Sequence, residues 1–297
     1  MTDVPSTATA ETAMQKVYAW PSVLVGLVGA GIQASRTPLL HEREGALHGL
    51  RYIYKLIDLE VMHLDASALP DILTAAQRLG FSGLNITHPC KQAVIPLLDE
   101  LSPDAAALGA VNTVVLKDGK RVGHNTDWWG FAESFKLALP DVKKNRVVQF
   151  GAGGAGAAVA HALLTLGVDE VILIDTHEDR AQTLARSLHE RFRARASATT
   201  DYPAALKTAD GIVNTTPLGM EKYPGMAFPA EFLRPDLWVA DIVYFPLETQ
   251  LLREARARGC RTMSGGGMAV FQAAGAFRLF TGLEPDAARM TQHFEGM

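Results

Sequence analysis

Three glycines in the second half of the chain have a spacing that suits dinucleotide binding. Gly151, Gly153 and Gly156 form G-x-G-x-x-G between the apolar run VVQF and an Ala-rich segment. Such glycines permit a tight turn, close approach of the backbone to a pyrophosphate, and close packing of the next helix, whose free N–H groups bind phosphate. The alternative is a packing turn without a ligand. We predict cofactor contacts along the whole turn: Gly151, Ala152, Gly153, Gly154, Ala155 and Gly156.

Asp175 follows the next predicted strand and bears on the choice of dinucleotide. A carboxylate at this position accepts hydrogen bonds from ribose hydroxyls and repels a 2′-phosphate. The sequence therefore predicts NAD, with NADP less favoured, although Arg180 and His177 nearby weaken this argument. The alternative is that Asp175 only caps a helix or a turn.

Polar side chains gather where the predicted strands of the first half end. Because the carboxyl ends of parallel strands meet at one edge of a sheet, we expect one site there. Uncharged hydrogen-bonding groups with one Lys and one Asp suit a polyhydroxylated carboxylic acid. A Lys held by an Asp can exchange a proton with a carbinol hydroxyl as hydride leaves the carbon. Each residue could instead serve only a turn, a strand or a helix start. The residues are Ser35, Thr37, Asn85, Thr87, Lys91, Asn112, Asn125 and Asp127.

Short β-rich runs alternate with longer segments of helical period, which predicts an α/β fold with a largely parallel sheet in each half. Asp118-Gly119 predicts a hairpin between two short extended runs. The expected strands are 23–29, 52–59, 83–87, 146–150, 170–176, 211–216 and 238–243, with a short one at Arg261. The expected helices include 69–80, 179–192, 248–258, 268–280 and 284–295.

A length of 297 residues favours two domains. We predict a disordered arm over 1–20, a substrate-binding and catalytic domain over 21–127 completed by the C-terminal helices of 268–297, and a Rossmann dinucleotide-binding domain over 128–267.

Composition argues against several classes of protein. The 28 Lys and Arg against 32 Asp and Glu, a net charge of -4, predict no nucleic-acid partner. The two cysteines lie far apart and the nine histidines lack zinc-ligand spacing, so we predict no metal. Without a signal peptide or an apolar run of about 18 residues, we expect no membrane contact and a cytoplasmic location. We expect a monomer or a homodimer.

Seven motifs resemble those of the shikimate dehydrogenase family, in particular its shikimate/quinate dehydrogenase branch, and the likeness extends from about Leu24 to Met297. They are S-R-T-P at 35–38, N-I-T-H-P-C-K at 85–91, G-A-V-N-T at 109–113, G-H-N-T-D at 123–127, G-A-G-G-A-G at 151–156, N-T-T-P-L-G-M at 214–220 and Q-A-A-G-A-F-R-L-F-T-G at 272–282. The resemblance implies reversible oxidation of the ring hydroxyl of shikimate or quinate to the 3-dehydro product, with hydride passing to NAD.

The resemblance also implies roles for individual residues. Lys91 is the implied acid/base and Asp127 its partner, while Ser35 and Thr37 hold the substrate carboxylate. The implied ligands of the ring hydroxyls are Thr87, Asn112, Asp127 and Gln272, with Asn85 and Tyr244 also lining the substrate site. The implied cofactor contacts beyond the glycine-rich turn are Asp175, Arg180, Thr215, Gly219 and Gly265.

The chain departs from the family pattern at several positions. Asp175-Thr176-His177 stands where NADP enzymes carry an Asn-Arg-Thr-like cluster, which agrees with NAD. Thr37 replaces the usual Ser and is similar to the quinate-accepting branch. Cys90, Gly267 and Phe271 also differ from common family residues.

Two alternatives therefore remain open. One is an NAD dehydrogenase of the same fold that acts on another hydroxylated carboxylic acid. The other is a non-catalytic dinucleotide-sensing protein, which would need neither Lys91 nor Asp127.

Overall fold

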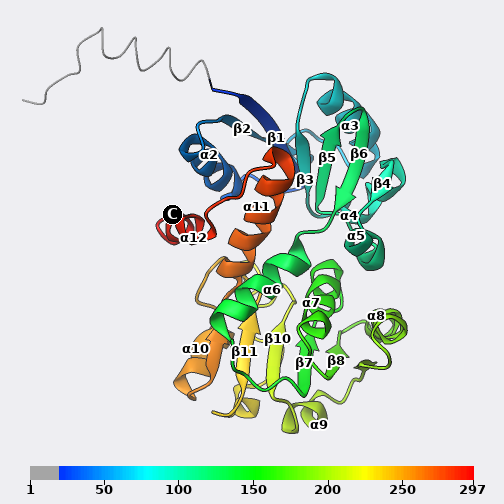
Figure 1. Ribbon diagram of the computed structural model, residues 1–297. Coiled ribbons are helices and arrows are strands. Elements are labelled where there is room, and N and C mark those ends of the chain that lie inside the picture. Colours follow the sequence, from blue (N-terminus) through cyan, green and yellow to red (C-terminus); the bar gives the residue numbers. More distant parts are fainter. Residues whose placement is uncertain (1–19) are drawn as a thin grey trace, which may run out of the picture. The chain divides into compact units, whose positions relative to one another are not determined.

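The computed structural model describes residues 20–297, which divide into two compact units (Figure 1). Unit 1 holds the described chain up to His124 together with Ala276–Met297, and unit 2 holds Asn125–Gly275. The sequence-based boundaries at 127/128 and 267/268 lie close to these, and the second structural boundary falls within α11 (Gly265–Thr281). Apart from Trp20, the expected disordered arm lies outside the described residues.

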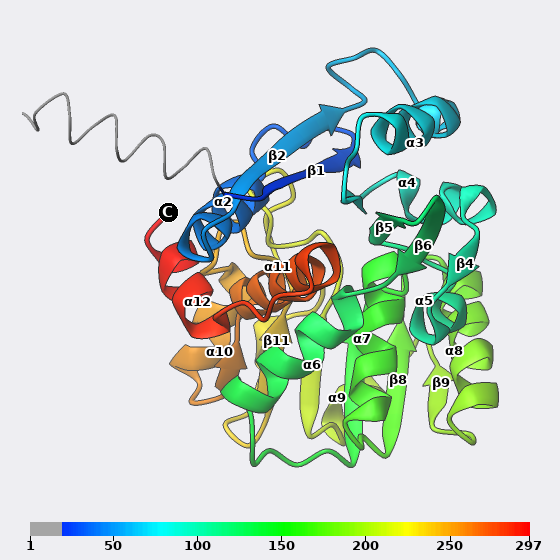
Figure 2. The ribbon, with the colours of Figure 1, turned by 45° about the horizontal axis from the view of Figure 1, so that its top comes forward.

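Unit 1 is built on a six-stranded mixed sheet in the order β2-β1-β3-β5-β6-β4. β1 runs parallel to β2 and β3, as Figure 2 shows for β1 and β2, whereas β5 runs antiparallel to β3. The carboxyl ends of the three parallel strands therefore meet the start of β5 at one edge. The strands are β1 (Ser22–Gly29), β2 (Arg51–Asp58), β3 (Gly83–Ile86), β4 (Glu100–Leu101), β5 (Thr113–Lys117) and β6 (Lys120–His124).

Local sequence explains the helices and turns of unit 1. In α3, Leu69, Leu73 and Ala76 recur at helical spacing and pack into a core with Leu84 of β3. The predicted hairpin is confirmed, since Asp118 and Gly119 both have positive φ between β5 and β6. The helices are α2 (Thr37–Leu47), α3 (Leu69–Arg78), α4 (Cys90–Ala93), α5 (Pro103–Leu108) and α12 (Ala287–Glu295), with 3-10 turns at Ala66–Ala68 and Ile95–Leu97.

Unit 2 contains a six-stranded sheet in the order β12-β11-β10-β7-β8-β9, and all its strand pairs are parallel. The chain proceeds from β7 outward to β9 and then returns to β10 on the other side of β7. This reversal is the switch point at which doubly wound sheets bind their ligands. The strands are β7 (Arg146–Phe150), β8 (Glu170–Ile174), β9 (Ala196–Ala198), β10 (Gly211–Asn214), β11 (Trp238–Asp241) and β12 (Arg261–Met263).

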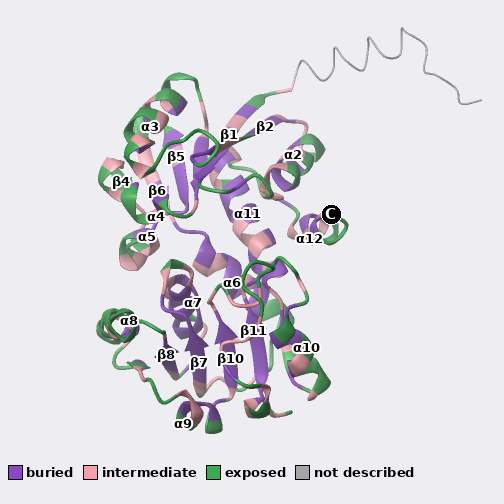
Figure 3. Cartoon of the chain, turned by 180° about the vertical axis from the view of Figure 1, so that it is seen from behind, coloured by how far each residue is buried: buried purple, intermediate pink, exposed green. Residues whose placement is uncertain are grey.

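The unit 2 sheet is covered on both faces, as the buried strands in Figure 3 show. Val147 packs into one apolar cluster with residues of α6, α7 and α8, and its neighbour Val148 packs into another with residues of α9 and α10. Continuous burial explains why these strands are apolar runs without alternation. The helices are α6 (Asp127–Ala138), α7 (Gly154–Thr165), α8 (Glu178–Arg191), α9 (Tyr202–Lys207) and α10 (Gln250–Ala257), with a 3-10 turn at Ala230–Phe232.

In residues 20–297, no helix is both long and apolar enough to cross a membrane. The same residues include no group of three or more His, Cys, Asp or Glu side chains placed to hold a metal ion.

Candidate active site

The glycine-rich turn lies between β7 and α7 at the switch point of unit 2. Gly151 has φ of +100°, and a Cβ there would lie 2.7 Å from the Thr215 hydroxyl oxygen. A Cβ on Gly156 would lie 2.4 Å from the carbonyl oxygen of Gly151. The Thr215 hydroxyl donates to that carbonyl oxygen at 2.8 Å, so the loop after β10 secures the turn. Packing within the protein is therefore enough to require glycine at positions 151 and 156, whether or not a ligand binds.

Gly153 differs, because a Cβ there would meet no described atom within 4 Å. Gly153 is the N-cap of α7 and precedes the unsatisfied N–H groups of its first turn. Open space above this backbone, beside the positive end of a 12-residue helix, fits a bound pyrophosphate. The turn therefore has the shape and the donors that a dinucleotide needs.

Asp175 follows β8 and is engaged with the protein backbone. One carboxylate oxygen accepts the Ala152 N–H at 2.8 Å, and the other accepts the His177 N–H at 2.8 Å. Burial raises the pKa of this carboxyl, but the two N–H donors and the Arg180 charge, 3.8 Å away, bring the pKa below its ordinary value. Asp175 thus holds the glycine-rich turn and a local turn. The oxygen that accepts the His177 N–H also accepts the Thr176 hydroxyl at 3.5 Å, whereas the oxygen that accepts the Ala152 N–H has a second lone pair for a further donor.

A second buried carboxylate, Asp241, joins the loops after β10 and β11. It accepts hydrogen bonds from the Thr249 hydroxyl at 2.7 Å, the Asn214 amide at 2.9 Å and the Val243 N–H at 3.1 Å. Burial raises the pKa of Asp241 despite these donors. Gly219 lies in the first of these loops, with its hypothetical Cβ 3.3 Å from Thr249.

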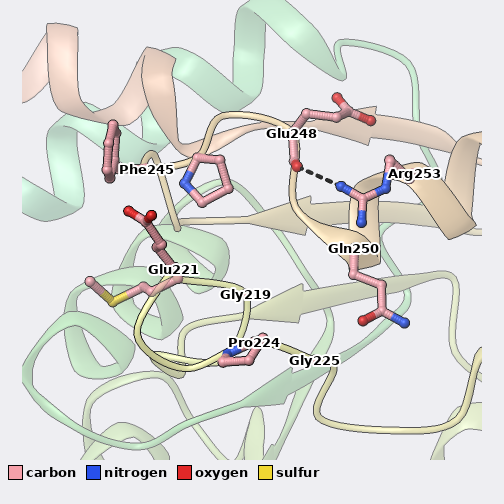
Figure 4. A pocket seen from close by; sticks show the side chains of 10 residues that line it. Gly219, Glu221, Pro224, Gly225, Phe245, Glu248, Gln250 and Arg253 are labelled. Atoms are coloured by element: carbon pink, nitrogen blue, oxygen red, sulfur yellow. Dashed lines mark hydrogen bonds between the residues drawn. The ribbon is translucent and has the colours of Figure 1, made fainter.

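Residues of the two loops and of α10 line an open cavity of about 450 Å³ (Figure 4). Of the predicted site residues, Gly219 is the one that lines it; Tyr244 precedes the lining residues Phe245 and Pro246. Gly265 is buried at the start of α11, where a Cβ would lie 2.2 Å from the carbonyl oxygen of Ile242.

In unit 1, three segments that carry predicted substrate ligands are joined by backbone hydrogen bonds. The Ala30 N–H, in the loop before Ser35, donates to the His88 carbonyl at 3.0 Å. The Val111 N–H, next to Asn112, donates to the Lys91 carbonyl at 2.9 Å. Ser35, Thr37, Thr87, Lys91 and Asn112 thus come from segments that lie together at the carboxyl edge of β1 and β3.

Asn85 has a role that its position in the motif did not reveal. Its amide oxygen accepts the Tyr54 hydroxyl at 2.8 Å, and its amide nitrogen donates to the Asn112 carbonyl at 3.3 Å and the Thr113 hydroxyl at 3.0 Å. The Thr113 hydroxyl in turn donates to the Asn112 side-chain oxygen at 3.0 Å. Asn85 is buried and uses its amide within this network, so it orients Asn112.

Cys90 and Lys91 occupy the short helix α4. Cys90 is fully buried, and burial raises the pKa of its thiol, which makes it an apolar packing residue rather than an activated thiolate. Lys91 is half-buried beside it.

The remaining predicted substrate residues, Asp127, Tyr244 and Gln272, belong to unit 2. Asp127 is the first residue of α6, and its N–H donates to the Asn125 side chain at 3.0 Å. A Cβ on Gly130 would lie 2.8 Å from the Gln272 nitrogen, so this glycine lets α6 approach α11 closely. Lys91 and Asp127 thus belong to different units, and their pairing stays a prediction.

Sequence reasoning missed Tyr54, Thr113, Asp58 and Asp241 as residues that support the two sites. Tyr54 and Asp58 lie on one strand and Asp241 ends another, so each looks like an ordinary strand residue in the sequence. For Asp58 and Asp241, an acidic residue at the carboxyl end of an apolar strand was the available signal, whereas Tyr54 in mid-strand and Thr113 at a strand start offered none.

The class of protein defined by this fold and these sites is a two-domain α/β dehydrogenase with a Rossmann-type dinucleotide-binding domain. Three family models match in succession: the shikimate dehydrogenase substrate binding domain at residues 27–114, shikimate / quinate 5-dehydrogenase at 133–218, and the shikimate 5′-dehydrogenase C-terminal domain at 265–293. The chain belongs to the shikimate dehydrogenase family.

The similar proteins carry names that specify different cofactors. A shikimate dehydrogenase (NADP(+)) from Streptomyces avermitilis is 59% identical over 91% of this chain and 94% of its own. A quinate/shikimate dehydrogenase (NAD(+)) from Corynebacterium efficiens is 50% identical over 92% of this chain and 98% of its own. The solved quinate dehydrogenase from Corynebacterium glutamicum in complex with NAD is 47% identical, with a TM-score of 0.88 over 93% of this chain and 100% of that one.

Proposed function

We propose that this protein is an NAD-dependent shikimate/quinate dehydrogenase that reversibly oxidises the ring hydroxyl of shikimate or quinate to the 3-dehydro product. The observation that carries the proposal is the joining of the Ser35, Lys91 and Asn112 segments at one edge of unit 1. The acid would bind mainly to the substrate-binding domain, 21–127 with 268–297, and the dinucleotide to the Rossmann domain, 128–267.

Substrate recognition would use the polar residues that the sequence motifs contain. Ser35 and Thr37 precede and begin α2, where hydroxyls and helix N–H groups suit a carboxylate. Asn112 is held by the Asn85 network and would bind a ring hydroxyl with its side chain. The other proposed ligands of the ring are Thr87, Asp127, Tyr244 and Gln272.

The chemistry requires one proton and one hydride to leave the carbinol. NAD, when bound, supplies the acceptor of the hydride and its electron pair. Lys91 would take the hydroxyl proton at Nζ as the C–O double bond forms, and would return it in the reverse reaction. Asp127 would hold the resulting ammonium by its charge.

The geometry of Asp175 supports NAD over NADP. Its carboxylate keeps acceptor capacity at the end of β8, where ribose hydroxyls bind in Rossmann folds. A lowered pKa keeps the carboxyl charged at neutral pH, so a 2′-phosphate would meet like charge. Arg180 is exposed, and its charge is directed at Asp175.

The proposal is tested by initial rates of oxidation, measured from the change in nicotinamide absorbance. Four combinations are compared: shikimate or quinate, each with NAD or NADP. We expect turnover with NAD, and turnover of both acids would support the quinate-accepting branch. Turnover with neither acid, while calorimetry shows NAD binding, would favour another hydroxylated acid or a non-catalytic sensor. Shikimate-only activity would indicate a pocket reshaped near Phe271 and Gln272.

Asp175→Ala separates the two cofactors. We expect the ratio of kcat/KM for NAD to that for NADP to fall by about tenfold, because the ribose ligand and the repulsive charge are both removed. Asp179→Ala, which removes an exposed carboxylate of α8, is the matched control. An unchanged ratio in Asp175→Ala, or faster turnover with NADP in the wild type, would refute the NAD assignment. A cytoplasmic location and a monomeric or dimeric state remain predictions.

A further inference from the structure

Asp58, the last residue of β2, is a buried carboxylate whose acceptor positions are all used. One oxygen accepts the Gly31 N–H at 2.9 Å and the Glu60 N–H at 3.1 Å. The other accepts the Ile32 N–H at 3.0 Å and the Gln33 side-chain amide at 2.9 Å. Four donors fill the roughly four lone-pair sites of a carboxylate.

Three of these donors belong to the loop that follows β1, residues 30–36. In this loop Gly31, Gln33 and Ala34 are exposed, so burial does little to hold it. Ile32 is the buried side chain of the segment. The hydrogen bonds to Asp58 therefore hold residues 31–33 in the middle of the loop, together with the Ala30–His88 hydrogen bond and the burial of Ile32.

The loop conformation reaches the residues expected to bind the substrate carboxylate. The Ile32 carbonyl accepts the Ser35 N–H at 3.0 Å, and the Ser35 hydroxyl accepts the Thr37 N–H at 3.3 Å. A continuous chain of hydrogen bonds thus leads from the Asp58 carboxylate through Ile32 to Ser35 and Thr37.

We propose that Asp58 is a positioning residue for recognition of the substrate carboxylate: it orders the 30–36 loop so that Ser35 and Thr37 present their hydroxyls in one arrangement. This inference rests on the proposed function. Asp58 acts through the loop and need not touch the substrate.

The charge of Asp58 is compatible with an anionic ligand nearby. Its four N–H donors direct their positive ends at the carboxylate and offset its charge locally. The Gln33 amide and the other donors also lower the pKa of Asp58, so it stays ionised and keeps all four acceptor positions. An amide at this position would turn an NH₂ group toward two of the donors.

The test is Asp58→Asn, assayed with NAD and with two substrates: the acid that the wild type oxidises, shikimate or quinate, and its methyl ester, which lacks the negative charge. We expect KM for the acid to rise roughly 10- to 100-fold, with kcat and KM for NAD changed by no more than about threefold. The preference for acid over ester, measured as a ratio of kcat/KM, should fall by a similar factor.

The ratio is independent of the folded fraction, because both substrates are measured with one preparation. A merely structural role would lower both activities equally and leave the ratio unchanged, which would overturn the proposal. If Asp58→Asn does not fold, Gln33→Ala removes one donor from the exposed side. We expect it to lower the same ratio by about two- to fivefold, and an unchanged ratio would again count against Asp58.

Asp65→Asn is the matched control. Asp65 is an exposed aspartate of unit 1 whose carboxylate accepts the Ser67 N–H at 2.8 Å in a similar local turn, but it holds no part of the 30–36 loop. Its acid-to-ester ratio should equal that of the wild type. Failure of the wild type to oxidise either acid would refute the proposed function, whereas wild-type oxidation with an unchanged ratio in Asp58→Asn would refute only this inference.

Discussion

The two units build their sites at the carboxyl edges of their sheets by different means. Unit 1 directs side chains to its edge and locks them through hydrogen bonds, such as those of Asn85 and Asn112. Unit 2 has glycines at its edge, and Gly151 and Gly156 permit backbone contacts that a Cβ would prevent. A polyhydroxylated acid needs specific donors and acceptors, whereas a pyrophosphate needs close backbone N–H groups, and the two edges reflect that difference.

Each edge also contains a buried aspartate that holds loops together. Burial and hydrogen-bond donors act in opposite directions on the pKa of such a carboxyl, and a different one of the two prevails in each unit. Asp58 in unit 1 receives four N–H donors, which lower its pKa. In Asp241 of unit 2, burial dominates over the donors and raises its pKa. Two aspartates that hold loops in similar ways can therefore have pKa values shifted in opposite directions.

The largest expected effect comes from removing the proposed acid/base side chain of unit 1, Lys91, while the residues of unit 2 are unchanged. Lys91→Ala should lower kcat by on the order of 10²- to 10⁴-fold, because the proton acceptor is lost. NAD binding, measured by calorimetry, should stay unchanged. Lys117→Ala, at an exposed position of β5, is the control and should keep wild-type turnover. Near-normal turnover of Lys91→Ala would show that another group exchanges the proton.

An intermediate effect should distinguish two glycines of unit 2. Gly156→Ala forces a Cβ against the Gly151 carbonyl, so we expect a loss of about 1–3 kcal/mol in unfolding free energy together with weaker NAD binding. Gly153→Ala enters open space, so thermal unfolding should match the wild type while NAD affinity falls by about tenfold or more. Unchanged NAD affinity in Gly153→Ala would contradict the pyrophosphate site.

The smallest effect is a difference in pH dependence between Asp58→Asn and Asp241→Asn. The folded pKa of Asp58 lies below the ordinary 3.8, so its stabilisation is complete above that pH and is lost as pH falls through the folded pKa. The folded pKa of Asp241 lies above 3.8, so its contribution weakens as pH rises through that folded pKa. Urea unfolding at several pH values should give wild-type-minus-variant differences with opposite slopes, and equal slopes would remove the contrast.

Much of the framework could be predicted from local patterns. The apolar strands, the Asp118-Gly119 hairpin and the glycine-rich turn each depend on neighbouring residues, and the structure contains all three. The short elements β4, β9, α5 and α9 were not predicted, because a few residues carry too little periodicity to identify them. The full burial of Cys90 beside Lys91 also depends on tertiary packing and could not be predicted from its place in the motif.

The sequence by itself determined the α/β class and the hairpin, because these depend on spacing and short-range turn chemistry, and the resemblance of seven motifs indicated the family and the candidate residues. Only the tertiary structure decided that Tyr54 orients Asn85, that Asp58 orders the loop after β1, and that Asp175 holds Ala152. In each case donor and acceptor lie more than twenty residues apart. Their meeting depends on strand order and register, which bring distant positions together at one sheet edge and leave no periodic signal in the chain.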